Sequence, residues 1–262
     1  MLASGLLDTI YNNIYTIVIG KCFNSTALGV YSRADGLANF PSSNITGVIQ
    51  GVTFPVLSSI QNDEERLAVG YKKLLRLSAF IIFPLMVGLA AVADPFIRLV
   101  LTDKWEGTIY YLQILCFALM WYPIHAINLN LLMATGRSDY FLKLEVIKKI
   151  QSVIVLCATV PLGLVAMCYG RIFNSIICLI WNTYYTKKII GYGYAQQMKD
   201  LMHILLHSLV MGAIVFGVVC MLPNLWLKLI VGVFAGMAYY IAGAYLMKFE
   251  EMQELLLILK RK

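Results

Sequence analysis

Charged residues are scarce in this sequence: they make up 13% of the 262 residues, while 60% are apolar. Soluble domains carry roughly 25% charged residues. The deficit extends along most of the chain, which excludes a single membrane anchor on a soluble body. A spanning helix needs about 20 mostly apolar residues. The composition predicts an all-α, polytopic integral membrane protein with no room for a separate globular domain.

The sequence lacks the common catalytic and nucleotide-binding motifs. Gly20-Lys21 is followed by Cys22 and has no glycine five residues earlier, so it is not a Walker A loop. No H-E-x-x-H and no G-x-S-x-G occurs. His203 and His207 have a spacing that suits a metal, but no third ligand stands out. We therefore expect neither an enzyme nor a cofactor or metal site, and transport is the remaining class.

Other signals are missing too. No basic residue precedes the first apolar run, so a cleavable signal peptide is not evident. The six cysteines are scattered without a C-x-x-C pair, which favours reduced cysteines packed as small apolar residues. The net charge of +7 comes from basic residues clustered between apolar stretches. That pattern indicates membrane topology rather than nucleic-acid binding.

Eight apolar stretches are predicted to span the membrane. They cover residues 4–22, 28–59, 78–101, 108–133, 147–169, 171–190, 203–222 and 225–247. We predict a six-helix lobe over residues 1–190, an accessory helix pair over 191–247 and a cytoplasmic amphipathic tail over 248–262. Residues 62–76 are too polar to span, and we interpret them as a cytoplasmic connecting helix.

The basic residues predict the orientation. With eight spans, one side of the membrane receives 15 lysines and arginines and the other receives 6. The first group is Arg66, Lys72, Lys73, Arg76, Arg137, Lys143, Lys148, Lys149, Lys187, Lys188, Lys199, Lys248, Lys260, Arg261 and Lys262. The second is Lys21, Arg33, Arg98, Lys104, Arg171 and Lys228. Positive residues remain cytoplasmic, so both termini are expected in the cytoplasm.

A polar stripe runs along the second predicted span. Its members recur every three or four residues: Ser32, Asp35, Asn39, Ser43, Thr46, Gln50 and Thr53. Pro41 should kink this helix. Such a stripe lines either a water-filled cavity or a helix–helix interface, and Gly47–Gly51 and Gly232–Gly236 have the spacing of packing motifs. The length of the stripe, together with the charges of Arg33 and Asp35, favours a cavity.

Single charges remain ambiguous. Asp94 and Arg98 are four residues apart and could pair on one helix face. Arg33 and Lys21 lie near the outer ends of their spans, where snorkelling to the interface competes with substrate binding. Asp8 could hold a coupling cation, or could belong to a solvated helix start.

Several short motifs, in order, resemble the bacterial polysaccharide flippases that export O-antigen and capsule repeat units. They are NIYTIVIGK at 13–21, LGVYSRA at 28–34, FPVLS at 54–58 followed by Gln61, FPLM at 83–86, Lys104-Trp105 and TGRSD at 135–139. The family belongs to one superfamily with the lipid II flippases and the multidrug and toxin extrusion transporters. The match covers residues 5–150 well.

The resemblance implies export of an undecaprenyl-diphosphate-linked oligosaccharide, for lipopolysaccharide or capsule, across the bacterial inner membrane. Arg33 and Lys21 would contact the diphosphate. Asp35, Asn39, Asn44 and Gln50 would contact the substrate as well, the amides binding sugar. Partners would be the lipid-linked oligosaccharide, the bilayer, and a polysaccharide polymerase or a further lobe.

This sequence also departs from the family pattern. Members have two six-helix lobes that alternate access, and this chain resembles the C-terminal lobe with the terminal helix pair, so we interpret it as a fragment. Tyr15 stands where many relatives carry an aspartate. Two alternatives stay open: a cation-coupled multidrug exporter, which should have a carboxylate deep in a span, and an inactive truncated membrane protein or interaction partner.

Overall fold

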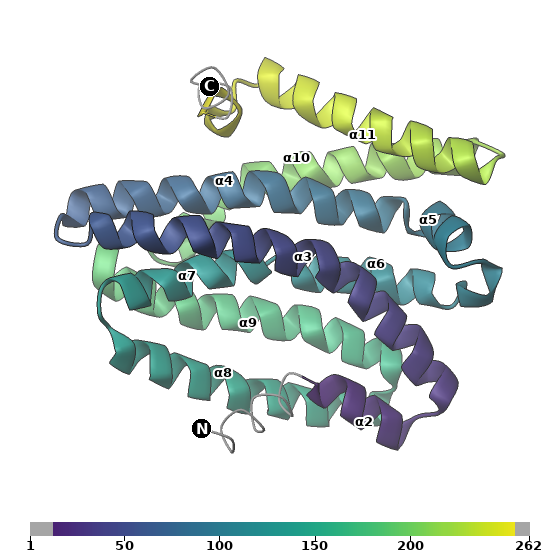
Figure 1. Ribbon diagram of the computed structural model, residues 1–262, viewed down its shortest axis with the longest axis horizontal. Helices are drawn as coiled ribbons and strands as arrows, with labels where there is room; N and C mark the ends of the chain where they lie inside the picture. Colours follow the sequence, from purple (N-terminus) through teal and green to yellow (C-terminus); the bar gives the residue numbers. More distant parts are fainter. Residues whose placement is uncertain (1–12, 255–262) are drawn as a thin grey trace.

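The computed structural model describes residues 13–254, and its regular structure is entirely helical over that range (Figure 1). The elements, in chain order, are α2 (Ile14–Cys22), α3 (Ser25–Ser59), α4 (Glu64–Ala91), α5 (Ala93–Val100), η1 (Asp103–Trp105), α6 (Thr108–Leu119), α7 (Tyr122–Ala134), α8 (Ser138–Thr159), η2 (Val160–Leu162), α9 (Leu164–Ile190), α10 (Tyr194–Met221) and α11 (Leu225–Leu246). The predicted all-α fold is therefore confirmed. The N-terminal part of the first predicted span, with Asp8, lies outside the described residues.

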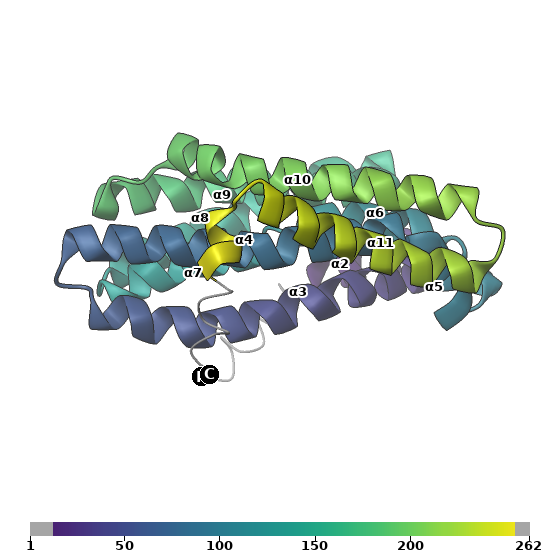
Figure 2. The same ribbon diagram turned by 90° about the horizontal axis from the view of Figure 1, so that it is seen from above.

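The long helices form a bundle around α4. Helix α4 lies between α10 and α3, and α11 packs on α10 at the outside (Figure 2). Helices α3 and α9 enclose α6 and α7, while α8 covers the far side of α9 (Figure 1). One apolar core runs through the bundle, and its largest buried side chains include Tyr31, Tyr71 and Phe83.

The predicted count of eight spans is not confirmed. Within residues 13–254, five helical segments are long and apolar enough to cross a membrane: α4, α6 with α7, α9, α10 and α11. Helices α3 and α8 have 35 and 22 residues but are more polar. Only residues 14–22 of the first predicted span are described, and they form the short helix α2.

Two predicted boundaries are wrong. Residues 62–76 are no separate connecting helix, because α4 begins at Glu64, capped by Asp63, and continues unbroken to Ala91. No glycine or proline lies between Arg76, the last charged residue of α4, and Pro84, so nothing ends the helix where the apolar part begins. The break predicted near residue 170 occurs at residues 160–163, where η2 contains a proline and Gly163 has φ of 96°. A positive φ of this kind favours glycine.

The helix pair α10 and α11 packs through glycines. A Cβ built at Gly236 would lie 2.9 Å from Val215, and one at Gly232 would lie 3.2 Å from Val219. The predicted packing role of Gly232–Gly236 is therefore confirmed. Gly47 and Gly51 differ, because nothing lies within 4 Å of a Cβ built at either position. Within the described structure, the glycine face of α3 is open.

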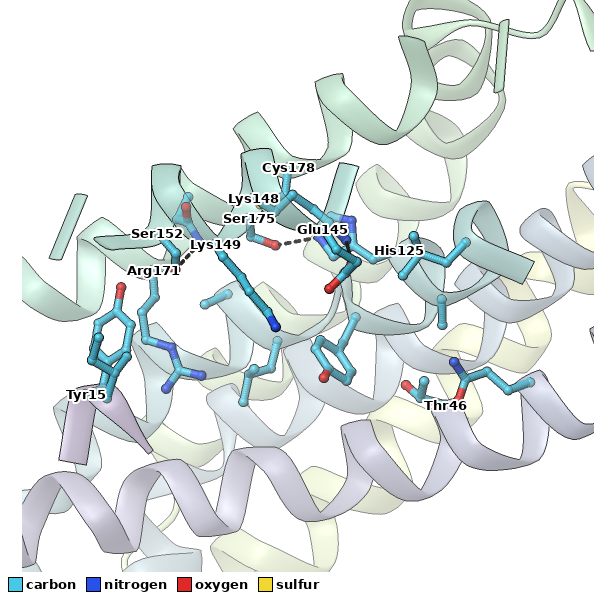
Figure 3. Close-up of a pocket in the computed structure, with 18 residues that line it drawn as sticks. Tyr15, Thr46, His125, Glu145, Lys148, Lys149, Ser152, Arg171, Ser175 and Cys178 are labelled. Atoms are coloured by element: carbon cyan, nitrogen blue, oxygen red, sulfur yellow. Dashed lines mark hydrogen bonds and ion pairs between the residues drawn. The ribbon is translucent and has the colours of Figure 1, made fainter. Parts of the chain in front are cut away.

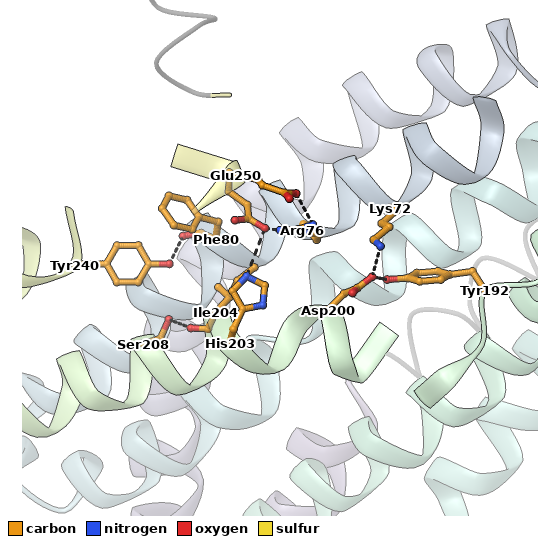
Figure 4. A network of polar contacts seen from close by, with 11 residues as sticks. Lys72, Arg76, Phe80, Tyr192, Asp200, His203, Ile204, Ser208, Tyr240 and Glu250 are labelled. Atoms are coloured by element: carbon orange, nitrogen blue, oxygen red, sulfur yellow. Dashed lines mark hydrogen bonds and ion pairs between the residues drawn. The ribbon is translucent and has the colours of Figure 1, made fainter. Parts of the chain in front are cut away.

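Ion pairs attach the end of the chain to the bundle. Arg76 on α4 binds Glu250 and Glu251 (Figure 4). Lys73 binds Glu254 at 2.9 Å. The predicted pairing of Asp94 with Arg98 is confirmed at 2.8 Å, and Arg98 also binds Asp103 and Glu106. Arg98 donates hydrogen bonds to these three carboxylates, and the bond to Asp94 has the largest effect on its pKa. The bonds raise the pKa of Arg98, so this arginine remains charged.

Candidate functional site

A polar cavity of about 610 Å³ lies inside the bundle, between α2, α3, α7, α8 and α9 (Figure 3). Its lining is rich in groups that carry charge or form hydrogen bonds. These are Tyr15, Thr46, Gln50, Tyr122, His125, Glu145, Lys148, Lys149, Ser152, Arg171, Asn174 and Ser175. Three cationic side chains face one carboxylate in this lining, so the cavity is suited to an anion.

Three side chains hold Arg171, one of these cations, in place. Its guanidinium forms an ion pair with Asp35 on α3 and donates to the hydroxyl of Tyr31 at 2.8 Å. It also lies 5.2 Å from the ring centroid of Tyr15, a distance typical of cation–π contact. The side chain of Arg171 is 21% exposed and that of Asp35 is 31% exposed. The planar fork is thus fixed at the cavity wall with part of its surface accessible.

Helix α8 supplies the other two cations from the middle of its length. Lys148 and Lys149 point into the cavity, and Lys148 binds Glu145 at 2.6 Å (Figure 3). The opposite side of α8 exposes apolar residues, among them Leu142, Ile150 and Ile154. Helix α8 is therefore amphipathic, with a cationic side facing the cavity.

Amides and hydroxyls complete the wall between α8 and α9. Gln151 donates from Nε2 to Oδ1 of Asn174 at 2.9 Å, and Asn174 donates to the hydroxyl of Ser152 at 3.3 Å. His125 on α7 contacts the hydroxyl of Ser175 at 3.0 Å through Nε2. These bonds fix the rotamers of side chains that can offer hydrogen bonds to a sugar.

The residues predicted as substrate contacts are not brought together. Arg33 is exposed and stacks on Trp105 of η1 at 5.2 Å, and Lys21 is exposed at the end of α2. Asn39 and Asn44 lie on the open side of α3, where the amide of Asn44 donates to the carbonyl of Phe40. Two further predicted residues do reach the site: Gln50 lines the cavity and Asp35 binds Arg171.

The predicted stripe of α3 divides into two faces. Of its members, Thr46 and Thr53 are buried, whereas Ser32, Asn39, Ser43 and Gln50 are exposed. The exposed face is not uniformly polar, because it includes two apolar residues: Phe40 is 72% exposed and Val48 is 70% exposed. The stripe lies at the margin between buried and open faces rather than at the centre of either.

This division predicts opposite reactivities for two adjacent serines. Ser42 is fully buried and donates to the carbonyl of Leu119, while Ser43 is exposed. In a cysteine-free variant of this chain, Ser43→Cys should react with a polar methanethiosulfonate at least about tenfold faster than Ser42→Cys, because the reagent attacks an accessible thiolate. Mass spectrometry of the labelled protein measures both rates. Equal rates would mean that α3 has a different rotation in solution.

Three functional candidates escaped prediction from the sequence: Lys148, Lys149 and Arg171. Sequence reasoning placed them at the ends of spans, because the break between α8 and α9 was set about ten residues too late. Removing these cavity residues leaves 13 basic residues on one side and 5 on the other, which keeps the sign of the predicted orientation. The spacing of Lys148, Gln151 and Ser152 was an available signal of a polar helix face.

Comparisons with known proteins give a consistent result. The family described as "Polysaccharide biosynthesis protein" matches residues 1–110. The lipopolysaccharide biosynthesis protein WzxC of Escherichia coli K12 is 30% identical over 204 residues, which cover 76% of this chain and 41% of that protein. The teichuronic acid biosynthesis protein TuaB of Bacillus subtilis 168 is 25% identical over 218 residues, covering 83% and 45%.

The fold also matches a solved structure. The lipid II flippase MurJ, in an inward closed conformation, aligns with a TM-score of 0.74 at 18% sequence identity, over 91% of this chain and 52% of that one. The chain thus spans less than half the length of the two curated relatives named above and about half of this flippase. The resemblance to polysaccharide flippases found in the sequence is therefore confirmed, and the chain aligns with about half of the length of these proteins.

Proposed function

We propose that this chain forms one lobe of a flippase that moves a polyprenyl-diphosphate-linked oligosaccharide across the bacterial inner membrane for lipopolysaccharide or capsule synthesis. The observation that carries the proposal is the cavity, which presents Arg171, Lys148 and Lys149 beside amide and hydroxyl groups. A diphosphate needs cations and a sugar needs hydrogen-bonding groups. Similarity to a lipopolysaccharide biosynthesis protein supports this substrate class.

The individual contacts follow from position. Arg171 offers a planar fork to phosphate oxygens, and the two lysines offer point charges from the neighbouring helix α8. Gln50 and Asn174 are placed to contact sugar hydroxyls. Arg33 and Lys21, both exposed, would contact the diphosphate outside the cavity as the substrate enters or leaves, and Asp35 would act by holding Arg171.

The open face of α3 is our proposed contact with a second lobe. Phe40 and Val48 are more than two-thirds exposed there, and Gly36, Gly47 and Gly51 have free space around them. Asn39 and Asn44 lie on this side and would line the space between the lobes. On this proposal α3 and α8 also span the membrane, because their polar sides face cavities rather than lipid.

We also propose how the chain is arranged in the membrane. It comprises a lobe of residues 1–190, an accessory pair of residues 191–247 and a tail after residue 248, with both termini cytoplasmic as the excess of basic residues suggests. A drug exporter is less favoured, since the partly buried carboxylate of Asp35 is already paired with Arg171. We propose a transporter rather than an enzyme.

Neutralising the two cavity lysines tests the proposed function. The double variant Lys148→Gln/Lys149→Gln should lower export about tenfold or more, since hydrogen bonds to charged groups contribute about 1.5–3 kcal/mol each. The matched control is Lys143→Gln, which lies on the same helix, is exposed and is not among the cavity residues. Surface glycan would be measured in a flippase-deletion strain, using a two-lobed protein that contains this chain, with membrane levels checked by blotting. Normal glycan from a well-expressed double variant would refute the assignment.

A further inference from the structure

A row of buried polar side chains leads from the cavity to the loop between α9 and α10. At the cavity, Nδ2 of Asn182 donates to Nδ1 of His125 at 3.0 Å. Next, the hydroxyl of Thr186 lies 3.1 Å from the carbonyl of Asn182 and donates to Oδ1 of Asn128 at 2.7 Å. Gln197 then contacts Oδ1 of Asn128 at 3.5 Å. We call Asn182, Thr186, Asn128 and Gln197 the polar row.

The far end of the polar row reaches charged groups. Gln197 donates to the carbonyl of Tyr192 at 3.4 Å, and the hydroxyl of Tyr192 donates to Asp200 at 2.6 Å (Figure 4). Asp200 forms an ion pair with Lys72 at 3.0 Å, and the lysine side chain is 44% exposed. The polar row thus reaches a half-exposed ion pair at the end of α4 and α10 by way of Tyr192, whose backbone carbonyl accepts from Gln197 and whose hydroxyl donates to Asp200.

The polar row is too deeply buried and too poorly satisfied to be packing alone. Each of its four residues is 2% exposed or less. Two of its acceptors, Oδ1 of Asn182 and Oε1 of Gln197, have no hydrogen-bond partner among the described residues. A buried acceptor left unsatisfied costs about 1–3 kcal/mol, and ordered water is its usual partner. Polar residues that serve only as packing glue would satisfy each other.

We propose that the polar row, with water at its unsatisfied acceptors, is a proton pathway between Asp200 and His125, and that His125 is the group that takes up the proton. In the neutral imidazole, Nδ1 accepts from Asn182 and Nε2–H donates to Ser175. Uptake forms an N–H bond at Nδ1 and breaks an O–H bond of the donating hydronium. The amide of Asn182 then turns, so that its unpartnered Oδ1 accepts from the new N–H.

The surroundings of His125 give this protonation a use. The charged and titratable groups around the cavity, besides His125, are Glu145, Lys148 and Lys149 on α8, Arg171 and Cys178 on α9, Tyr15 on α2 and Tyr122 on α7. A positive imidazole adds to this cationic lining, so that proton and anion would bind together. The proton pathway goes beyond the proposed function. Only the coupling between proton binding and anion binding rests on that function.

Proton exchange at His125 tests the pathway without any transport assay. The chain contains three histidines, so histidine labelled with ¹³C and ¹⁵N gives few NMR signals, assigned by single His→Gln substitutions. The full chain would be studied in lipid nanodiscs, measuring how fast the imidazole N–H of His125 exchanges with water. Thr186→Val and Gln197→Met keep volume but remove the polar groups. Each should slow exchange about tenfold or more, because a proton relay needs every link.

Controls separate the pathway from general disturbance. Ser208→Ala removes a buried hydroxyl on α10 outside the polar row and should leave the rate unchanged. Gln197→Glu keeps a polar group in place and should retain fast exchange if Gln197→Met fails to fold. Unchanged exchange at His125 in folded Thr186→Val or Gln197→Met would overturn the pathway and show that the cavity supplies the proton. Failure of export with normal exchange would count against the proposed function alone.

Discussion

Replacing Arg171 by alanine is expected to abolish glycan export, the largest functional effect predicted for any single residue of this chain. The change removes the cation that binds Asp35, Tyr31 and Tyr15 at the cavity wall. It also leaves Asp35 without its partner, which should cost about 3 kcal/mol, at the low end for buried pairs because both side chains keep some exposure. Surface glycan and the thermal stability of the purified protein measure the two effects.

Further variants separate charge from stability. Arg171→Gln should destabilise the protein, and adding Asp35→Asn should restore most of the stability, because no unpaired carboxylate then remains. Export should stay lost in the double variant, since the cation is still absent. The matched control is Arg137→Ala, an exposed arginine at the start of α8 that does not line the cavity. Export restored by the double variant would show that Arg171 serves only the structure.

Substituting leucine for Gly212 should give a large loss of stability. A Cβ built there overlaps the side chain of Val87, so α10 and α4 must move apart to admit a larger residue. Overpacking of this kind costs about 1–3 kcal/mol, and overlap with the stiff, β-branched side chain of Val87 places Gly212→Leu at the upper end. The melting temperature of the detergent-purified chain should fall accordingly.

The same helix offers a control for this prediction. Gly217 also lies on α10, but nothing is within 4 Å of a Cβ built there. Gly217→Leu should therefore leave the melting temperature almost unchanged. It is a direct control for Gly212→Leu, because both substitutions remove the same backbone freedom of a glycine. Equal losses from the two variants would mean that the close contact between α10 and α4 is absent.

The sequence predicts the fold class better than it predicts the site. Sparse charge and long apolar runs define an all-helical membrane protein, and the motif series identifies its relatives. The site depends on helix rotation and on exact breaks, and both follow from tertiary packing. Lys148 and Lys149 look like the first residues of a span until the break at Gly163 is known, and Arg171 looks like the outer end of a span.

The α3 stripe illustrates the same difficulty. Its spacing correctly indicates a polar helix side, but spacing alone does not show which neighbours cover that side. Gln50 lines the cavity and Asp35 binds Arg171 at its wall, whereas Asn39 and Asn44 do neither, although all four fall within 16 residues of one helix. The bend of α3 along its 35 residues, with Pro41 and Pro55 inside it, contributes to this separation (Figure 1).

Binding of a polyprenyl diphosphate to the purified chain tests the central claim most directly. The chain would be placed in nanodiscs containing undecaprenyl diphosphate, and the bound lipid measured by native mass spectrometry. The cavity predicts binding by the unchanged chain and by Lys143→Gln, with a loss of about tenfold or more in Lys148→Gln/Lys149→Gln, since its charge-assisted bonds are removed. Equal binding by all three proteins, or no binding by the unchanged chain, would contradict the assignment of the cavity to the diphosphate.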